Sequence, residues 1–248
     1  MKNKISGKIV ALLLTLIIVA TSGMPLYAKE TGDKANSFRY ENGQSIAKAV
    51  PFSTLSPNAW KKIDGKYYSG DGSVIEGAVA KGIDVSHHQG TVDWKKAKED
   101  GVEFAIIRCG FGMNQTKQDD AQWFNNVKGC EENNIPYGVY LYSYADTVKK
   151  AQSEAEHVLR LIKGHTLAYP VYYDIEEKAV LNKLTAEQLG KIAATFVNKV
   201  KAEGYQTGIY SNKSNFETFL TDSQFSQWNK WVAQYNSAAC TYKGTYQI

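Results

Sequence analysis

The sequence predicts an α/β protein in which a parallel sheet or barrel is covered on its outside by helices. Short apolar runs bounded by turn residues recur from Lys81 onward, and segments with helical spacing lie between them. Strands that alternate with helices pair in parallel, because each helix returns the chain to the same end of the sheet. With 43% hydrophobic residues, the chain has enough apolar surface for a packed core.

The first 28 residues have the order of a secretory signal peptide. Lys2, Lys4 and Lys8 precede an apolar run over 9–20, and the small residue Ala28 stands before Lys29. A retained anchor needs about 20 apolar residues, so the shorter run favours a cleaved signal. We therefore expect a secreted protein, with no stable membrane insertion after cleavage.

The charge balance bears on possible partners. The chain carries 29 basic and 25 acidic residues, but residues 1–28 hold three of the lysines and no acid, which leaves 26 against 25. Binding to nucleic acid requires many basic side chains on one face. A nearly neutral chain without a basic cluster argues against nucleic acid as the partner.

Two segments precede the predicted barrel. Residues 29–58 are polar and contain several glycines and prolines, which is typical of a flexible linker. Within residues 59–80, aromatic residues flank a turn signal at 70–72, which predicts a β-hairpin. This segment resembles one copy of the aromatic hairpin repeats that bind cell walls in choline-binding-type modules. A strap packed against the next domain and a wall-binding repeat are both consistent with it.

The predicted barrel occupies residues 81–248. Its strands are expected at 82–85, 104–109, 137–144, 170–175, 207–210 and 231–235, and its main helices at 121–133, 147–163 and 185–203. The last helix has the clearest limits, because Thr185 and Gln188 form a capping-box pattern and Gly204 follows its end.

Acidic residues stand where two predicted strands end, which is where barrels of this type place functional side chains. Asp84 ends the first strand, and Asp174 and Glu176 end the fourth. Residues two apart on a strand share a face. Cleavage of a glycosidic bond needs one protonated and one ionised carboxyl group. Like charges that lie close together raise one of the two pKa values and so favour that division.

The same residues carry a family resemblance. KGIDVSHHQGTVDW, FAIIRCGFG, IPYGVYLYSYA, YPVYYDIE, GIYSN and WVAQY occur in the order and spacing of glycoside hydrolase family 25 lysozymes. The resemblance implies an irregular TIM-like (β/α) barrel of five strand–helix units followed by a few antiparallel strands. It also implies cleavage of the β-1,4 bond between N-acetylmuramic acid and N-acetylglucosamine in bacterial peptidoglycan, in the medium or at the cell wall. Family members continue beyond the final TYQI, so we expect a barrel that is incomplete at its C-terminus and lacks a further acidic site residue.

The resemblance also implies roles for single residues. Glu176 falls on the proton donor, Asp174 on the acid that orients the N-acetyl group of the substrate, and Asp84 on the acid that polarises this pair. Substrate assistance and direct attack by water both stay open. Four aromatic residues are implied to line the groove: Tyr142, Tyr210, Trp231 and Tyr235.

No cofactor or metal is expected. His87 and His88, as neighbours in an extended segment, would point in opposite directions, and His157 and His165 have no metal-binding spacing. This argues against a metal-dependent wall deacetylase, whereas a non-catalytic wall-binding barrel that lost activity by truncation stays an alternative. The three cysteines fit unpaired core thiols better than a disulfide framework. We expect a monomer.

Overall fold

The computed structural model describes residues 40–41, 44–45, 61–69, 72–234 and 240–248. The predicted signal segment and most of the predicted linker lie outside these residues. Within them, no helix has the length and apolar character needed to cross a membrane.

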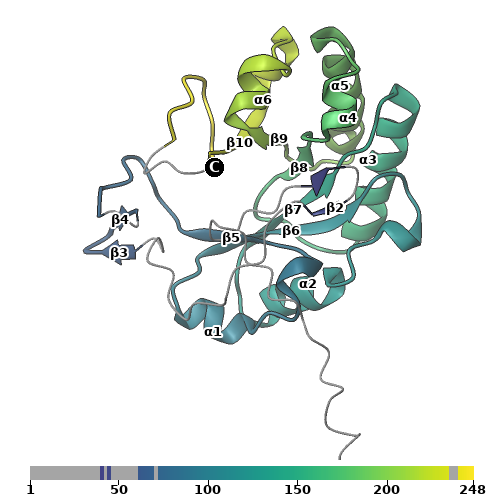
Figure 1. The fold of residues 1–248 in the computed structure, drawn as a ribbon. Coiled ribbons are helices and arrows are strands. Elements are labelled where there is room, and N and C mark those ends of the chain that lie inside the picture. The colour runs from purple at the N-terminus through teal and green to yellow at the C-terminus, as the bar shows by residue number, and fades with distance from the viewer. Residues whose placement is uncertain (1–39, 42–43, 46–60, 70–71, 235–239) are drawn as a thin grey trace, which may run out of the picture.

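The centre of the molecule is a curved sheet of six parallel strands (Figure 1). Its order is β10–β9–β8–β7–β6–β5, so every strand lies beside the strand before it in sequence, as in a barrel. The predicted α/β barrel class is therefore confirmed. Antiparallel strands of the kind that the resemblance implied do not occur among the described strands of this sheet. The strands are β5 (Gly82–Val85), β6 (Phe104–Phe111), β7 (Tyr137–Tyr142), β8 (Val171–Asp174), β9 (Thr207–Asn212) and β10 (Asn229–Ala233).

The three main helices lie within two residues of their predicted limits, and the predicted capping box is present at the start of α5. There, Thr185 N donates to Gln188 Oε1 at 2.9 Å and Gln188 N donates to Thr185 Oγ1 at 3.3 Å. The other helices are too short to give a periodic sequence pattern. The helices are α1 (Trp94–Glu99), α2 (Trp123–Glu132), α3 (Val148–Ile162), α4 (Lys178–Leu181), α5 (Ala186–Ala202) and α6 (Lys213–Thr218), with 3-10 turns η1 (His87–Gln89), η2 (Thr116–Gln118) and η3 (Ser223–Gln227).

The two faces of the sheet have different surroundings. The helices lie along the outer face (Figure 1), where Val171, Tyr173 and Ile175 of the β8 segment join the main hydrophobic core. Tyr173 stacks on Phe196 of α5 with ring centroids 4.0 Å apart. Because side chains alternate along a strand, Tyr172 and its even-numbered neighbours face the other way, and we call this side the inner face.

A hairpin precedes the barrel. Its strands are β3 (Lys61–Ile63) and β4 (Lys66–Tyr68), which pair in antiparallel fashion. Tyr67 is buried, and its hydroxyl donates to Glu103 Oε2 at 2.6 Å and to the carbonyl of Val79 at 3.0 Å. These bonds attach the hairpin to the segments that precede β5 and β6. A role of the hairpin in wall binding stays a prediction. A second, two-residue pair is formed by β1 (Tyr40–Glu41) and β2 (Gln44–Ser45).

The last described residues lie along the free edge of β10. Val232 N donates to the carbonyl of Ile248 at 2.7 Å, and Gln247 N donates to the carbonyl of Lys230 at 2.9 Å. Ile248 also packs with the aromatic side chains of the inner face. The outer edge of β10 is therefore partly satisfied by backbone hydrogen bonds.

The cysteines are free thiols, as expected. Cys109 and Cys130 are buried, and Cys240 is half-buried. The Cys109 thiol donates to the carbonyl of Tyr140 at 3.2 Å. Burial raises the pKa of Cys130 to about 12, which makes it an unreactive core residue.

A glycine on β9 allows close packing of the inner face, and this gives a stability prediction. A Cβ at Gly208 would lie 2.5 Å from the Tyr172 ring and 3.0 Å from the carbonyl of Asn229. We expect Gly208→Ala to lower the free energy of unfolding by about 1–3 kcal/mol, because neither neighbour has room to move. Urea denaturation measures this, with Asn198→Ala on the exposed side of α5 as a control that changes stability by less than about 0.5 kcal/mol. An equally small effect of Gly208→Ala would contradict the close packing.

Candidate active site

Four strands present one row of side chains at the C-terminal end of the inner face. The strand register places Tyr142 beside Asp174, Asp174 beside Tyr210, and Tyr210 beside Trp231. By this register, all four side chains lie on the inner face of the sheet. The row therefore joins a carboxylate to three aromatic side chains that are far apart in sequence.

Hydrogen bonds on both sides fix the end of β8. Ser143 N donates to the carbonyl of Asp174 at 2.9 Å, Ile175 N donates to the carbonyl of Tyr210 at 3.0 Å, and Ser211 Oγ donates to the carbonyl of Ile175 at 2.6 Å. The strand-like pairing thus continues to the residue before Glu176. Asp174 and Glu176 are both buried, with 2% and 8% of their surface exposed.

Glu177, the residue after Glu176, has a structural role. Glu177 is also buried, but its carboxylate accepts from Ala179 N at 3.3 Å and so caps α4. It also accepts from the Tyr142 hydroxyl at 3.2 Å. Two neighbouring glutamates therefore differ in role, because one ends the inner face and the other begins a helix.

The three predicted acids influence one another electrostatically. Burial raises the pKa of Asp174 well above its ordinary value, the charges of Glu176 and Asp84 raise it further, and the charge of Arg108 lowers it. Burial raises the pKa of Asp84 to about 7. Asp174 Oδ1 is buried and has no hydrogen-bond partner among the described residues. Asp84, on β5, therefore lies close enough to Asp174 for its charge to raise the pKa of Asp174.

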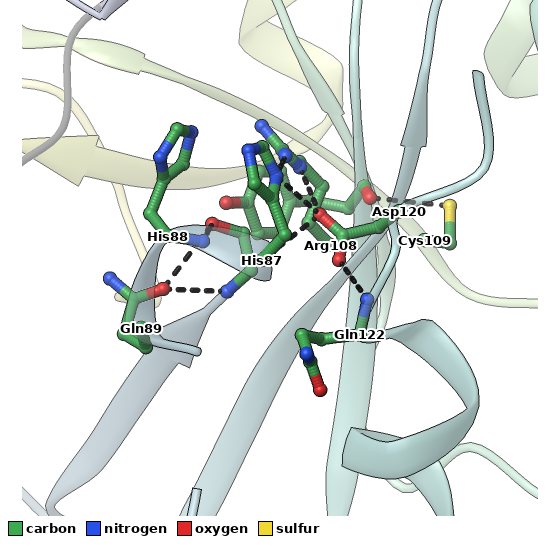
Figure 2. A network of polar contacts seen from close by, with 9 residues as sticks. His87, His88, Gln89, Arg108, Cys109, Asp120 and Gln122 are labelled. Atoms are coloured by element: carbon green, nitrogen blue, oxygen red, sulfur yellow. Dashed lines mark hydrogen bonds and ion pairs between the residues drawn. The ribbon is translucent and has the colours of Figure 1, made fainter. Parts of the chain in front are cut away.

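A buried arginine, Arg108, lies near these acids and was not among the residues predicted from the sequence. Arg108 on β6 is 3% exposed, and its Nε donates to Asp120 Oδ2 at 2.7 Å. A second guanidinium nitrogen donates to His87 Nδ1 (Figure 2). A charged residue inside the apolar run FAIIRCGF is an available sequence signal, because arginine is rarely buried unless it is paired.

The expectation that His87 and His88 lie in an extended segment is wrong. They lie in the 3-10 turn η1, which a capping box of Ser86 and Gln89 begins, and their rings are 3.9 Å apart (Figure 2). Burial, and then the charge of Arg108, lower the pKa of His88 to about 4. Among the residues that the structure describes, no cluster of three or more His, Cys, Asp or Glu side chains could hold a metal ion.

The predicted substrate-binding aromatics are mostly covered. Tyr142 and Tyr210 are 2% and 7% exposed. Trp231 is half-buried, and its ring centroid lies 4.4 Å from that of Tyr210. Tyr235 lies outside the described residues. Contact of these side chains with a sugar stays a prediction.

Two further aromatics lie partly exposed beside this row. Tyr144 continues the alternation of Tyr140 and Tyr142, and its ring centroid lies 5.1 Å from that of Tyr142. Phe111, at the end of β6, meets Tyr144 edge-on at 6.4 Å. The sequence analysis did not consider Phe111, although it ends a strand as Asp84 does.

A carboxylate on α3 supports the end of β7 from the outer side. Glu154 is fully buried and accepts from Ser143 Oγ at 2.8 Å, from Tyr173 Oη at 2.5 Å and from Tyr144 N at 2.9 Å. Burial raises the pKa of Glu154 to about 7, although these hydrogen bonds oppose the shift. The bonds hold β7 and β8 in a fixed relation immediately behind Asp174.

The sequence profile of glycosyl hydrolases family 25 matches residues 83–247, which is more than half of the chain. The chain belongs to this family. The autolytic lysozyme of Clostridium acetobutylicum is 28% identical over 155 residues, which are 62% of this chain and 45% of that protein. The family 25 chain described here thus spans less than half the length of that relative.

Solved structures agree with the family. The modular autolysin LytC from Streptococcus pneumoniae has a TM-score of 0.65 and 28% identity, over 89% of this chain and 56% of LytC. A bacterial lysozyme from Streptomyces coelicolor has a TM-score of 0.58 and 23% identity, over 67% of this chain and 79% of that one. At that identity the second likeness shows the fold alone, and it confirms the TIM-like barrel type.

The raised pKa of Asp174 predicts that this residue lowers stability. A carboxyl group with a higher pKa in the folded state binds protons more strongly there, so its folded protein loses stability as the pH rises above the ordinary value of 3.8. We expect Asp174→Asn to be more stable than the unmodified chain at neutral pH. The difference should grow by at most about 1.4 kcal/mol per pH unit and vanish at acidic pH. Urea denaturation at several pH values measures it.

Asp120→Asn provides a control of opposite sign. Burial opposes ionisation of Asp120, but its bonds to His87 and the charge of Arg108 prevail and lower its pKa to about 2. Its ionised form therefore stabilises the fold above the ordinary value of 3.8, and that contribution is lost as the pH falls through about 2. Asp120→Asn should lower stability at neutral pH. Shifts of the same sign in both variants would contradict the assigned charges.

Proposed function

We propose that this chain is a secreted lysozyme that hydrolyses the β-1,4 bond between N-acetylmuramic acid and N-acetylglucosamine in bacterial peptidoglycan. The observation that carries the proposal is that Asp84 on β5 and Glu176 after β8 both act electrostatically on Asp174, at the C-terminal end of one sheet face. Membership of family 25 supports it, as do relatives whose names are autolytic lysozyme, autolysin and bacterial lysozyme.

Glu176 is the proposed proton donor. It gives its proton to the glycosidic oxygen while the bond from that oxygen to the anomeric carbon breaks, and positive charge develops on the sugar. Asp174, ionised, stabilises this charge and orients the N-acetyl group of the substrate. Asp84 acts on this pair through its charge. Either the N-acetyl oxygen or a water molecule then attacks the anomeric carbon, and Glu176 recovers a proton when water completes hydrolysis.

The surroundings of the acids support the division between a protonated and an ionised carboxyl group that this step requires. Desolvation and like charge favour one protonated carboxyl in the group. The half-buried Trp231 and Tyr144 offer flat apolar surfaces on which a sugar ring can pack. The predicted signal segment at residues 1–28 supports export to the medium or the cell wall, where the chain is proposed to act as a monomer.

Removal of the proton donor gives the direct test. We expect Glu176→Gln to lower the release of reducing ends from purified peptidoglycan by about 100- to 10,000-fold, because the amide cannot donate a proton to the leaving oxygen. Folding should be retained, since the substitution barely changes the shape of the side chain. A reducing-sugar assay measures the rate, and circular dichroism confirms the fold.

Glu177→Gln is the matched control, because it removes a buried carboxylate one residue further on. Its expected effect is a loss of stability from the weakened cap of α4, with a rate within about tenfold of the unmodified chain. Near-normal hydrolysis by Glu176→Gln would defeat the proton-donor role. Wall binding without any release of reducing ends by the unmodified chain would favour the non-catalytic alternative.

A further inference from the structure

Two neighbouring aspartates each pair with a different arginine, and the two pairs have opposite surroundings. Asp119 binds Arg160 of α3 through both carboxylate oxygens, at 3.0 and 2.5 Å, and these side chains are 19% and 35% exposed. Asp120 binds Arg108 at 2.7 Å, and these side chains are 0% and 3% exposed. The first pair is an ordinary surface contact, whereas the second is enclosed beside the acids of the site.

The buried guanidinium is held firmly. The Asp120 carboxylate that binds it also accepts from His87 N at 3.1 Å and from Gln122 N at 2.9 Å (Figure 2). Arg108 further donates to His87 Nδ1. The loop that carries Asp120 is itself anchored to β6, because Asp120 N donates to the carbonyl of Cys109 at 2.9 Å.

Stability does not explain this arrangement. Burial of an ion pair requires removing both charges from water, and well-packed apolar side chains of similar volume are often at least as stabilising. The neighbours of Arg108 on the same face of β6, Phe104 and Ile106, are apolar and buried. The charge at position 108 therefore calls for a functional reason.

The charge acts on the site. Of the charged groups that influence Asp174, Glu176 and Asp84 are acidic and Arg108 is the basic one within the described chain. Register places Arg108 beside Tyr140, which lies beside Tyr172, two residues before Asp174 on the same face. One fixed positive charge thus acts on Asp174, whose pKa is also raised by the charges of Glu176 and Asp84.

We propose that Arg108, held by Asp120, is a positioning residue that supplies the fixed positive charge needed to keep one carboxylate ionised among the three acids of the site. Without it, desolvation and mutual repulsion would favour protonation of all three. With it, Asp174 can carry a negative charge while Glu176 keeps its proton. The link to hydrolysis rests on the function proposed above, whereas the charge effect does not.

Several other ionisable groups face this region and must be included in any interpretation of a titration. They come from the turn after β5, from β7, from β9 and from the loops after β6 and β8: His87, His88, Tyr140, Tyr142, Tyr144, Tyr210, Asp120 and Glu177. Burial raises the pKa values of Tyr140, Tyr142 and Tyr144, so these side chains stay uncharged over the pH range in which the acids titrate.

The test is an NMR titration of side-chain carboxyl carbons in the full chain, with the Asp174 signal assigned from its loss in Asp174→Asn. In Arg108→Met, we expect the midpoints of the coupled Asp174–Glu176 pair to move to higher pH by about one pH unit or more, because a nearby positive charge is lost. Arg108→Lys should restore most of the shift, since lysine keeps the charge without the planar fork. Arg160→Met, which breaks the neighbouring surface pair, should leave the midpoints unchanged.

A second variant with a neutral residue at position 108 keeps the test decisive if Arg108→Met does not fold. If circular dichroism shows that Arg108→Met is unfolded, Arg108→Gln gives the same comparison while keeping a hydrogen-bond donor toward Asp120. Unmoved midpoints in a folded neutral variant would overturn the proposal and leave Arg108 a structural residue. Equal shifts in Arg108→Lys and the neutral variant would overturn it as well.

Activity measurements separate this proposal from the proposed function. The acid limb of the pH–rate profile should move to higher pH in the neutral variant and return in Arg108→Lys. If the unmodified chain releases no reducing ends, the proposed function fails, and the NMR titration still decides the role of Arg108. If the chain is active and the midpoints do not move, only the role of Arg108 fails.

Discussion

The gathering of three acidic side chains at one end of a parallel sheet, with Asp174 and Glu176 buried and Asp84 half-buried, is the constraint on which the site depends. Removal of a carboxyl group from water favours its protonated form, and every nearby negative charge adds to this effect. Asp174 experiences both influences, from burial and from Glu176 and Asp84. A mixed protonation state is useful for acid catalysis, but it requires an opposing charge. In the proposal above, Arg108 supplies that charge, and its bond to Asp120 keeps it at a fixed place.

Packing on the outer face of the sheet stabilises the strand that carries Asp174. Tyr173 and Ile175 flank Asp174 in sequence, and both pack among the helices of the outer face. Tyr173 also donates to Glu154, which accepts from Tyr144 N two residues after the end of β7. The two-residue period of a strand thus separates stability from chemistry. Each site residue on β8 is fixed by neighbours that never face the site.

The same period explains how far the sequence could predict the molecule. Apolar runs located all six strands of the sheet, and residue spacing placed Asp174 on the same face as Tyr172. Short helices such as α1 gave no periodic pattern, and the three-residue turn at His87–Gln89 gave none either, because a single turn is shorter than one helical period. The partner of Arg108 was not predictable from local patterns. It depends on a β-bulge after Arg108 and on the return of the following loop, which pairs Gly110 with Asp119 and so delivers Asp120.

Adjacent residues of like chemistry have unlike roles throughout this site. Glu176 ends the inner face and Glu177 caps a helix, while Asp120 binds the buried arginine and Asp119 binds an exposed one. The direction of the backbone decides which of the two aspartates enters the low-dielectric region, where a single charge has a large effect, and which of the two buried glutamates caps a helix. An acidic motif alone is therefore an incomplete description of such a site. A charge that balances the acids belongs to the same functional unit, even though it comes from a different strand.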